Sequence, residues 1–350
     1  MYMQDEHYMK RCFELAQLGS GTVSPNPMVG AVIVYEDKII GEGYTSPYGG
    51  PHAEVNAIQD CSSKYGQSAD ELFTKSTLYV SLEPCSHFGK TPPCADLIIQ
   101  KQFSKVVIGC IDPFAKVNGE GVKKIKDAGI EVMVGVLEKE AKWSNRRFFT
   151  KLEKSRPYVI LKWAETADGY FAPEEQQQLW ISNEASKQLV HKWRSEEDAI
   201  LVGKNTAIAD NPSLTVREWS GKNPKRILID KHLDVPLTNS IYSEEAETII
   251  FNDVKSEWTA KRKFIALENF DLYLPQTILY QLFLMDVQSI IIEGGAHTLQ
   301  QFIDANLWDE ARVITSKTIL HKGKKSPKIN GKITEILKIS TDTLKIILPL

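Results

Sequence analysis

Cysteine is scarce in this sequence, with five residues among 350. An odd and scattered set of this size does not make a disulfide framework, so we expect a reducing compartment. A basic charge balance is missing too, because the formal net charge is −3 at pH 7. Without a global positive footprint, nucleic acid is not favoured as a substrate.

Long apolar runs are also absent. The mainly apolar stretch 277–285 stops at Asp286, well short of a membrane span. The first residues, MYMQDE, lack the basic segment and apolar core of a secretion signal. We therefore expect a soluble, cytoplasmic protein with no membrane association. No G-x-G-x-x-G follows any expected strand, so a Rossmann domain is not supported either.

The sequence does contain the three ligands of a catalytic zinc ion, namely His52, Cys85 and Cys94. One imidazole and two thiolates leave the fourth tetrahedral position open for water, as catalytic zinc requires. Zinc lowers the pKa of bound water toward ~7, so hydroxide becomes available at neutral pH. The carboxylate of Glu54 is then a spare general acid/base, as in the H-x-E…P-C-x-x-C signature of nucleobase deaminases.

The second half of that signature is altered here. Eight residues separate Cys85 from Cys94, and this loop carries His87 and Lys90, which suit an anionic group such as a phosphate. His87 and Lys90 are predicted to bind the substrate. Asn26, which leads into an apolar strand, is predicted to bind it as well. The alternative is a closed zinc site in which His87 is a fourth protein ligand.

Length and pattern predict two α/β domains. A chain of 350 residues exceeds the size at which single cores stop growing. Helix and strand patterns alternate in both halves, as in a layered α/β fold. Apolar strands are expected at 29–35, 38–43, 77–82, 105–110, 131–136, 158–163, 199–202, 226–229, 248–251, 289–292, 311–315 and 343–348.

A charge-rich run at 138–156 ends at Pro157, and we place the domain boundary there. Arg146 and Arg147 within it could bind phosphate, although a solvated helix leading to a linker is the simpler interpretation. The predicted domains are residues 1–145 and 156–350. The basic run 322–328 contains Gly and Pro and is predicted to be a surface loop.

Several sequence words resemble one known family. In the first half they are PNPMVG at 25–30, GEGY at 41–44 and SLEPCSHFGKTPPCA at 81–95. In the second half they are RPYV at 156–159, LKWA at 161–164, ADG at 167–169, VHKWR at 190–194, DAILVG at 198–203, DNPSLTVR at 210–217 and EGG at 293–295. The chain resembles the bifunctional deaminase/reductase family of riboflavin biosynthesis, over nearly its whole length.

The resemblance implies an N-terminal cytidine-deaminase-like α/β/α sandwich and a C-terminal dihydrofolate-reductase-like α/β domain. It implies a multifunctional enzyme, a zinc hydrolase and an NADPH-dependent oxidoreductase. The first activity would deaminate 2,5-diamino-6-ribosylamino-4(3H)-pyrimidinone 5′-phosphate. The second would reduce the ribosyl side chain to ribitol, giving 5-amino-6-(5-phospho-ribitylamino)uracil. The expected partners are this phosphorylated small molecule and a second copy of the chain, with no nucleic acid.

The resemblance also implies roles for residues of the second half. Those expected to face NADPH are Ala164, Trp180, Thr206, Asp210 and Gly295. Those expected to face the substrate are Lys162, Arg194, Leu214, Arg217 and Glu293. Without the resemblance, the glycine pair at 294–295 would more often be a simple turn, and either arginine would more often be part of a surface ion pair. Three positions depart from the family pattern, namely Thr45, Phe114 and Gln178.

Two other functions explain part of the pattern. A deaminase of nucleic acids or free nucleosides would share the zinc ligands, but the long inter-cysteine loop and the lack of a basic, aromatic-rich face weigh against it. A reductase-like domain that serves only for binding or oligomerisation would explain the second half. The presence of Lys162, Asp210, Arg217 and Glu293 weighs against that interpretation.

Overall fold

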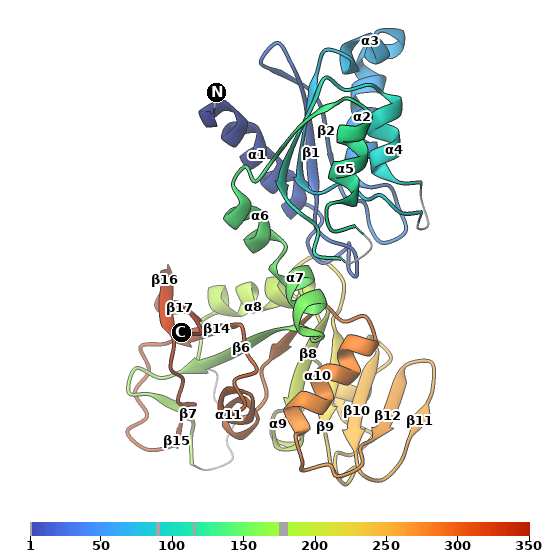
Figure 1. The fold of residues 1–350 in the computed structure, drawn as a ribbon. Coiled ribbons are helices and arrows are strands. Elements are labelled where there is room, and N and C mark those ends of the chain that lie inside the picture. The colour runs from blue at the N-terminus through green and yellow to red at the C-terminus, as the bar shows by residue number, and fades with distance from the viewer. Residues whose placement is uncertain (1, 89–91, 115–116, 175–180) are drawn as a thin grey trace. The chain divides into compact units, whose positions relative to one another are not determined.

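The computed structural model describes residues 2–88, 92–114, 117–174 and 181–350. The chain divides into two compact units, Met1–Lys154 and Ser155–Leu350, each with its own cores of buried apolar residues (Figure 1). No helix in the described ranges combines the length and apolar character that a bilayer span requires.

A five-stranded sheet with the order β2-β1-β3-β4-β5 forms the centre of the N-terminal unit. Strand β1 pairs antiparallel with β2 and β3, whereas β3, β4 and β5 run parallel. The strands are β1 Gly30–Tyr35, β2 Lys38–Tyr44, β3 Thr77–Leu82, β4 Lys105–Cys110 and β5 Glu131–Val134. The helices are α1 Tyr2–Gln17, α2 Ala53–Tyr65, α3 Ala69–Phe73, α4 Cys94–Gln100, α5 Glu120–Asp127, α6 Glu138–Ser144 and α7 Arg146–Lys154, with a 3-10 turn at Gly66–Ser68.

Helices cover both faces of this sheet (Figure 1). On one face, Met9 and Cys12 of α1 pack against Val32 of β1. On the other face, α2, α4 and α5 bury apolar residues against the same strands. Helix α2 lies close to β2 because that strand has glycine where they meet. A Cβ at Gly43 would lie 2.3 Å from the Ala57 nitrogen. The predicted α/β/α sandwich is confirmed.

The C-terminal unit contains a ten-stranded sheet with the order β11-β12-β10-β9-β8-β13-β6-β14-β17-β16. The run from β12 to β14 is parallel, and β11, β17 and β16 pair antiparallel at the edges. The strands are β6 Tyr158–Glu165, β7 Tyr170–Ala172, β8 Ala199–Gly203, β9 Lys225–Ile229, β10 Thr248–Asn252, β11 Glu257–Trp258, β12 Arg262–Ala266, β13 Ser289–Ile292, β14 Glu310–Thr315, β15 Lys324–Lys325, β16 Lys332–Ile339 and β17 Asp342–Leu348.

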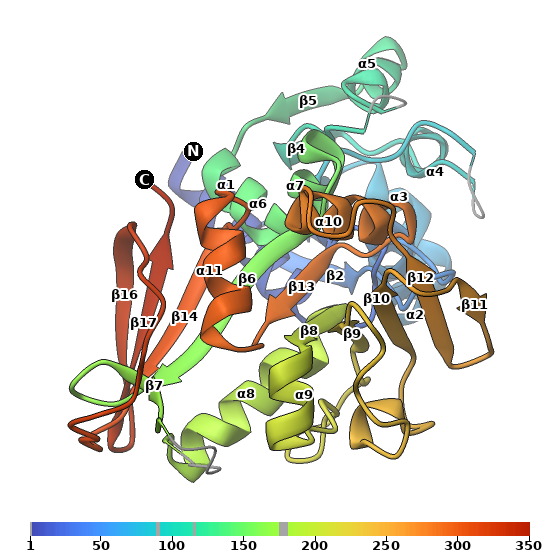
Figure 2. The same cartoon turned by 90° about the horizontal axis from the view of Figure 1, so that it is seen from below.

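Helices α8 and α9 lie on one face of this sheet, and α10 and α11 on the other (Figure 2). Each face has its own apolar core, because nearly all central strands are buried on both sides. The N-cap Asn183 accepts a hydrogen bond from the Ser186 nitrogen at 2.9 Å and so fixes the start of α8. The helices are α8 Glu184–Glu196, α9 Lys204–Asp210, α10 Leu274–Leu284 and α11 Ala296–Asp304, with a 3-10 turn at Ser240–Tyr242.

The basic run 322–328 is not only a loop, as the sequence had predicted. It contains β15, which pairs antiparallel with β7. The ammonium group of Lys325 lies 3.7 Å from the centre of the Tyr170 ring, which gives this short pairing a cation–π contact. The charge-rich run before the second unit forms α6 and α7, and the Arg146 guanidinium lies over the Trp143 ring at 4.3 Å.

Candidate active sites

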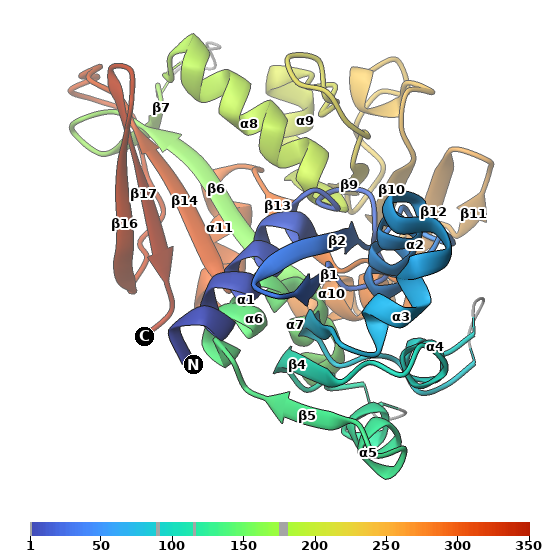
Figure 3. The ribbon, with the colours of Figure 1, turned by 90° about the horizontal axis from the view of Figure 1, so that it is seen from above.

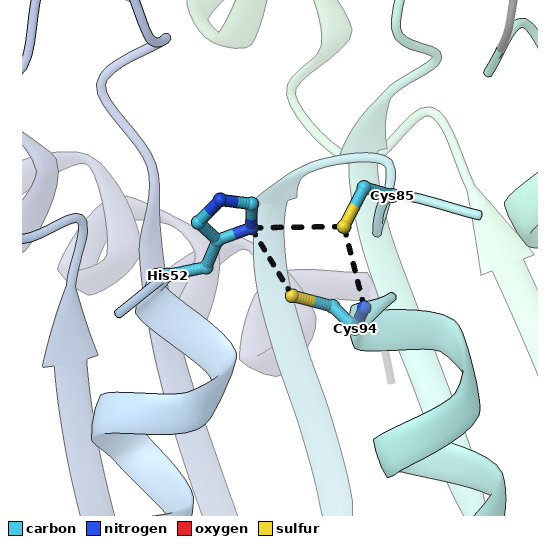
Figure 4. A group of neighbouring side chains, drawn as sticks. All are labelled: His52, Cys85 and Cys94. Atoms are coloured by element: carbon cyan, nitrogen blue, oxygen red, sulfur yellow. Dashed lines mark hydrogen bonds between the residues drawn. The ribbon is translucent and has the colours of Figure 1, made fainter. Parts of the chain in front are cut away.

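The three predicted zinc ligands come together in the N-terminal unit. The Nδ1 atom of His52 and the Sγ atoms of Cys85 and Cys94 all lie within 4.8 Å of one another (Figure 4). His52 is the N-cap of α2, Cys85 lies just after β3, and Cys94 begins α4. The starts of two helices therefore hold His52 and Cys94, and the end of a strand supplies the third ligand.

The spacing of these atoms fits tetrahedral zinc. His52 Nδ1 lies 3.3 Å from Cys94 Sγ and 3.6 Å from Cys85 Sγ. Ordinary zinc–nitrogen and zinc–sulfur bonds at the tetrahedral angle place such a pair about 3.5 Å apart. Among the described residues, His87 does not join this group, and its ring packs against Phe114 with centroids 5.7 Å apart. The described ligand set therefore leaves a coordination position for water.

Hydrogen bonds stabilise a thiolate at this site. A hydrogen bond from the Cys94 side chain lowers the pKa of the Cys85 thiol to about 4. Burial opposes this shift, and a hydrogen bond with His52 adds to it. The backbone nitrogen of Cys94 donates to Cys85 Sγ at 3.3 Å. A thiolate is the form that ligates metal, so the site is prepared for a divalent cation.

Glu54 lies in the first turn of α2 and is buried, with 4% of its surface exposed. Burial raises the pKa of its carboxyl group, and the negative charge of Cys85 adds to that effect. A raised pKa makes the carboxyl group easier to protonate, which favours its use in proton transfer. This behaviour is what the predicted general acid/base requires.

Glu83 is a buried carboxylate whose role the sequence analysis did not identify. It accepts hydrogen bonds from four backbone nitrogens, those of Asp112, Gly119, Gly121 and Val122, at 2.9–3.2 Å. These bonds tie the end of β3, next to Pro84 and Cys85, to the start of α5. The approach is close, because a Cβ at Gly121 would lie 2.1 Å from the Pro84 oxygen. The acidic residue just before Pro84-Cys85 was the available signal.

The other predicted residues of this site are less well placed. His87 lies beside the cluster in sequence, and its buried Nδ1 atom has no hydrogen-bond partner among the described residues. Asn26 lies in the loop before β1, and Lys90 lies outside the described residues, so both assignments remain predictions. Thr45, one of the departures from the family pattern, is buried and accepts a hydrogen bond from the Val29 nitrogen at 3.2 Å.

A second candidate site is a cleft of about 490 Å³ in the C-terminal unit. Eight of the residues predicted for the reductase reaction line it, although they come from separate strands, helices and loops. They are Lys162, Ala164, Arg194, Thr206, Asp210, Leu214, Arg217 and Glu293. Trp180 lies outside the described residues, as does Gln178.

A buried ion cluster lies in this cleft. Glu293 pairs with Arg194 at 2.8 Å and with Lys162 at 3.8 Å. Against the opposing effect of burial, these two cations lower the pKa of the Glu293 carboxyl group to about 2. Burial in turn lowers the pKa of Lys162. The buried Nε atom of Arg194 has no hydrogen-bond partner among the described residues, so a donor is available to an anionic ligand.

Arg217 ends a loop with unusual backbone geometry. Asn211 and Leu214 have positive φ angles of 42° and 55°, and Leu214 is buried. Such conformations persist only where the surroundings hold them, and they concentrate at functional sites. The fully buried Arg226, which the sequence analysis did not identify, donates to the carbonyl oxygens of Ser213 and Ser240 at 3.4 Å and 3.2 Å. Arg226 therefore fixes the backbone of this loop through buried hydrogen bonds.

The glycine pair at 294–295 forms the turn between β13 and α11. A Cβ at Gly294 would lie 2.5 Å from the Val202 Cα, so no side chain fits there. Gly295 has φ 22°, and its nitrogen donates to Thr206 Oγ1 at 2.8 Å. This bond places Gly295 next to a residue that lines the cleft, although Gly295 is not itself among the lining residues. The close-packed turn at the start of α11 lets backbone nitrogens approach a large anionic ligand such as NADPH.

Comparison with known proteins covers both units. Residues 2–110 match the cytidine and deoxycytidylate deaminase zinc-binding region, and residues 157–343 match the RibD C-terminal domain. The riboflavin biosynthesis protein RibD of Aquifex aeolicus is 42% identical over 326 residues, covering 91% of this chain and 88% of that protein. RibD of Escherichia coli is 34% identical, covering 91% of this chain and 89% of its own.

Solved structures agree with these sequence relatives. A Thermotoga maritima diaminohydroxyphosphoribosylaminopyrimidine deaminase/5-amino-6-(5-phosphoribosylamino)uracil reductase is 36% identical, with a TM-score of 0.90. The match covers 100% of this chain and 99% of that one. Acinetobacter baumannii RibD is 30% identical, with a TM-score of 0.89 and complete coverage of both chains.

Proposed function

This chain belongs to the RibD family of riboflavin-biosynthesis proteins, and on that basis we propose which residues carry its two reactions. The protein is a zinc-dependent deaminase and an NADPH-dependent reductase. It deaminates 2,5-diamino-6-ribosylamino-4(3H)-pyrimidinone 5′-phosphate and then reduces the ribosyl side chain to ribitol. The family, fold class, activities and cofactors expected from the sequence are confirmed. The domain limits 1–145 and 156–350 remain part of the proposal.

We assign the deaminase reaction to the His52, Cys85 and Cys94 cluster with Glu54. The three side chains would hold zinc, which supplies hydroxide at neutral pH by lowering the pKa of bound water. Glu54 takes a proton from the attacking water and delivers it to the departing amine. Oxygen thereby replaces nitrogen on the ring carbon and ammonia leaves. The convergence of the three ligand atoms within 4.8 Å is the observation that carries this assignment.

We assign the reductase reaction to the cleft of the C-terminal unit. NADPH supplies the hydride, and we place it against Ala164, Trp180, Thr206, Asp210 and the Gly295 turn. Arg194 and Arg217 would bind the substrate phosphate, because a guanidinium group matches phosphate in shape and charge. Lys162, Leu214 and Glu293 would complete the substrate site. The pairing of Glu293 with both Lys162 and Arg194 supports this placement.

Removal of the Arg217 guanidinium should lower the reductase activity and leave the deaminase activity unchanged. In Arg217→Ala we expect kcat/KM for NADPH oxidation to fall roughly 10–150-fold, the effect of a charge-assisted hydrogen bond worth ~1.5–3 kcal/mol. Ammonia release by the same preparation should not change. The matched control is Arg262→Ala, which removes a guanidinium that pairs with Glu244 at 3.3 Å and does not line the cleft. Equal effects of the two substitutions would contradict the assignment of Arg217.

We further propose that the protein acts in the cytoplasm on its small-molecule substrate alone, without nucleic acid, and as a homo-oligomer. Strand β16 supports the last point, because it is one of the two edge strands of the large sheet (Figure 3). Ile333, Ile336 and Leu337 on it are 48%, 62% and 41% exposed. An apolar edge strand of this kind invites a partner, and a second copy supplies an identical edge.

The oligomer proposal predicts a change in mass for an edge variant. In Ile336→Lys the added charge should weaken the association, so that light scattering after gel filtration gives the monomer mass. The control is Leu237→Lys, which changes a residue that is also 62% exposed but lies outside β16. A wild-type chain that elutes as a monomer would refute the homo-oligomer, and an unchanged Ile336→Lys oligomer would refute the role of β16.

A further inference from the structure

Helix α8 presents a stripe of four residues to the reductase cleft. Lys187, Val190, His191 and Arg194 line the cleft, at positions three or four residues apart that share one helix face. Arg194 is the predicted phosphate ligand of this helix, but His191 had no role in the sequence analysis. It is buried, with 2% of its surface exposed, at a place where a ligand is expected.

A hydrogen bond fixes the form of the His191 ring. The backbone nitrogen of Arg217 donates to His191 Nδ1 at 3.2 Å, so Nδ1 carries no proton. The single proton of a neutral ring then belongs to Nε2. Burial, with the positive charges of Arg194 and Arg217, lowers the pKa of His191 to about 4, which keeps the ring neutral at physiological pH. No described residue accepts a hydrogen bond from Nε2.

His191 also connects the two phosphate ligands. It is one helical turn from Arg194, which itself reaches toward the Thr215 carbonyl oxygen at 3.5 Å. Its Nδ1 atom accepts a hydrogen bond from the backbone nitrogen of Arg217, at the end of the loop that contains Leu214. The free Nε2–H donor therefore belongs to the group of side chains that surrounds the expected phosphate. A neutral donor suits a crowded cationic site, because it adds a hydrogen bond without adding another charge.

We propose that His191 is a substrate-binding residue of the reductase, with Nε2 donating to the phosphate of the substrate and Nδ1 positioning Arg217 for the same phosphate. The proposal rests on the function proposed above for Arg194 and Arg217. It assigns the specificity for a phosphorylated substrate to three side chains. Arg194 and His191 come from α8, and Arg217 comes from the loop that His191 holds.

Two substitutions separate the two nitrogens of the ring. In His191→Asn the side-chain oxygen lies near the place of Nδ1, so the acceptor for Arg217 can remain while the Nε2 donor is lost. In His191→Gln the amide nitrogen lies near the place of Nε2, so the donor remains and the acceptor is lost. His191→Phe removes both. Ammonia release by the same preparations reports whether each protein is intact, since that reaction belongs to the other unit.

The measurement is reductase kcat/KM for the deaminated substrate with its phosphate and for the same compound without it. We expect His191→Asn and His191→Phe to lose about 10-fold or more with the phosphorylated compound, as for a hydrogen bond to a charged group. Both should lose much less with the dephosphorylated compound. His191→Gln, which keeps the donor but no longer holds the Arg217 backbone, should lose part of the preference for phosphate, and less of it than His191→Phe. The dissociation constant of NADPH, measured by direct fluorescence titration, should stay within about 2-fold in all three variants.

Equal losses with both compounds would overturn the proposal and leave His191 a purely structural residue, as would unchanged kinetics in His191→Asn. If His191→Asn does not fold, the comparison of His191→Gln with His191→Phe decides, because only the first keeps the donor. Arg217→Ala in the same assay separates this failure from that of the underlying assignment. If Arg217→Ala keeps the preference for phosphate, the phosphate site itself is misplaced. If Arg217→Ala loses the preference for phosphate but the His191 variants keep it, the phosphate site stands and only the role of His191 is wrong.

Discussion

Substitution of Cys94 by alanine should release the zinc and abolish deamination, while the same chain continues to oxidise NADPH. Two ligands, His52 and Cys85, cannot hold the ion in the geometry that three provide. Without the metal the pKa of the attacking water returns toward ~15.7, so the loss of ammonia release should be at least about 10⁴-fold. Zinc content per chain and the two activities are the quantities to measure, with the deaminated compound supplied for the reductase assay.

The matched control for this loss is Cys12→Ala. Cys12 is also a fully buried thiol of the N-terminal unit, but it lies on α1 and outside the cluster. We expect Cys12→Ala to keep one zinc per chain and its deaminase activity. A Cys94→Ala protein that retained its zinc would remove the basis of the metal assignment.

Substitution of Glu54 by glutamine should have the opposite effect on the metal and a similar effect on the rate. The amide is nearly the same size, so zinc content should stay at one per chain. It cannot carry a proton between water and the leaving amine, and we expect deamination to fall at least ~10²–10⁴-fold. The control is Glu71→Gln. Glu71 is an exposed carboxylate on α3 that pairs with Lys75, just after that helix. Loss of zinc in Glu54→Gln would show that the carboxylate is structural or a ligand.

Elements with a strong local pattern were predictable from the sequence. The apolar, β-branched run KVVIGC forms β4 over Lys105–Cys110, and SIII forms β13 over Ser289–Ile292, both with the predicted limits. Helix α8 begins where Asn183 provides a cap. The zinc cluster was predictable for the same reason, because its ligand types and their spacing carry the chemistry without knowledge of the fold.

Features that depend on distant partners were not predictable. Strand β16, the sequence KITEILKI, is exposed along nearly its whole length, so it lacks the alternation of a half-buried strand. Glu83 and Arg226 are buried charges whose hydrogen-bond partners are mostly backbone groups, and any sequence supplies those. His191 becomes meaningful only when the fold brings the Arg217 nitrogen, 26 residues later, to its ring.

The central claim is that one chain carries two reactions in sequence on separate sites. The most direct test supplies the purified protein with the diaminopyrimidinone phosphate and NADPH, and measures ammonia and NADPH together. We predict that the wild type releases one ammonia for each NADPH oxidised. Glu54→Gln should oxidise NADPH only when the deaminated compound is supplied, and Arg217→Ala should release ammonia while oxidising NADPH slowly. A chain that oxidised NADPH without releasing ammonia from the diamino substrate, or in which either substitution abolished both reactions, would contradict the account.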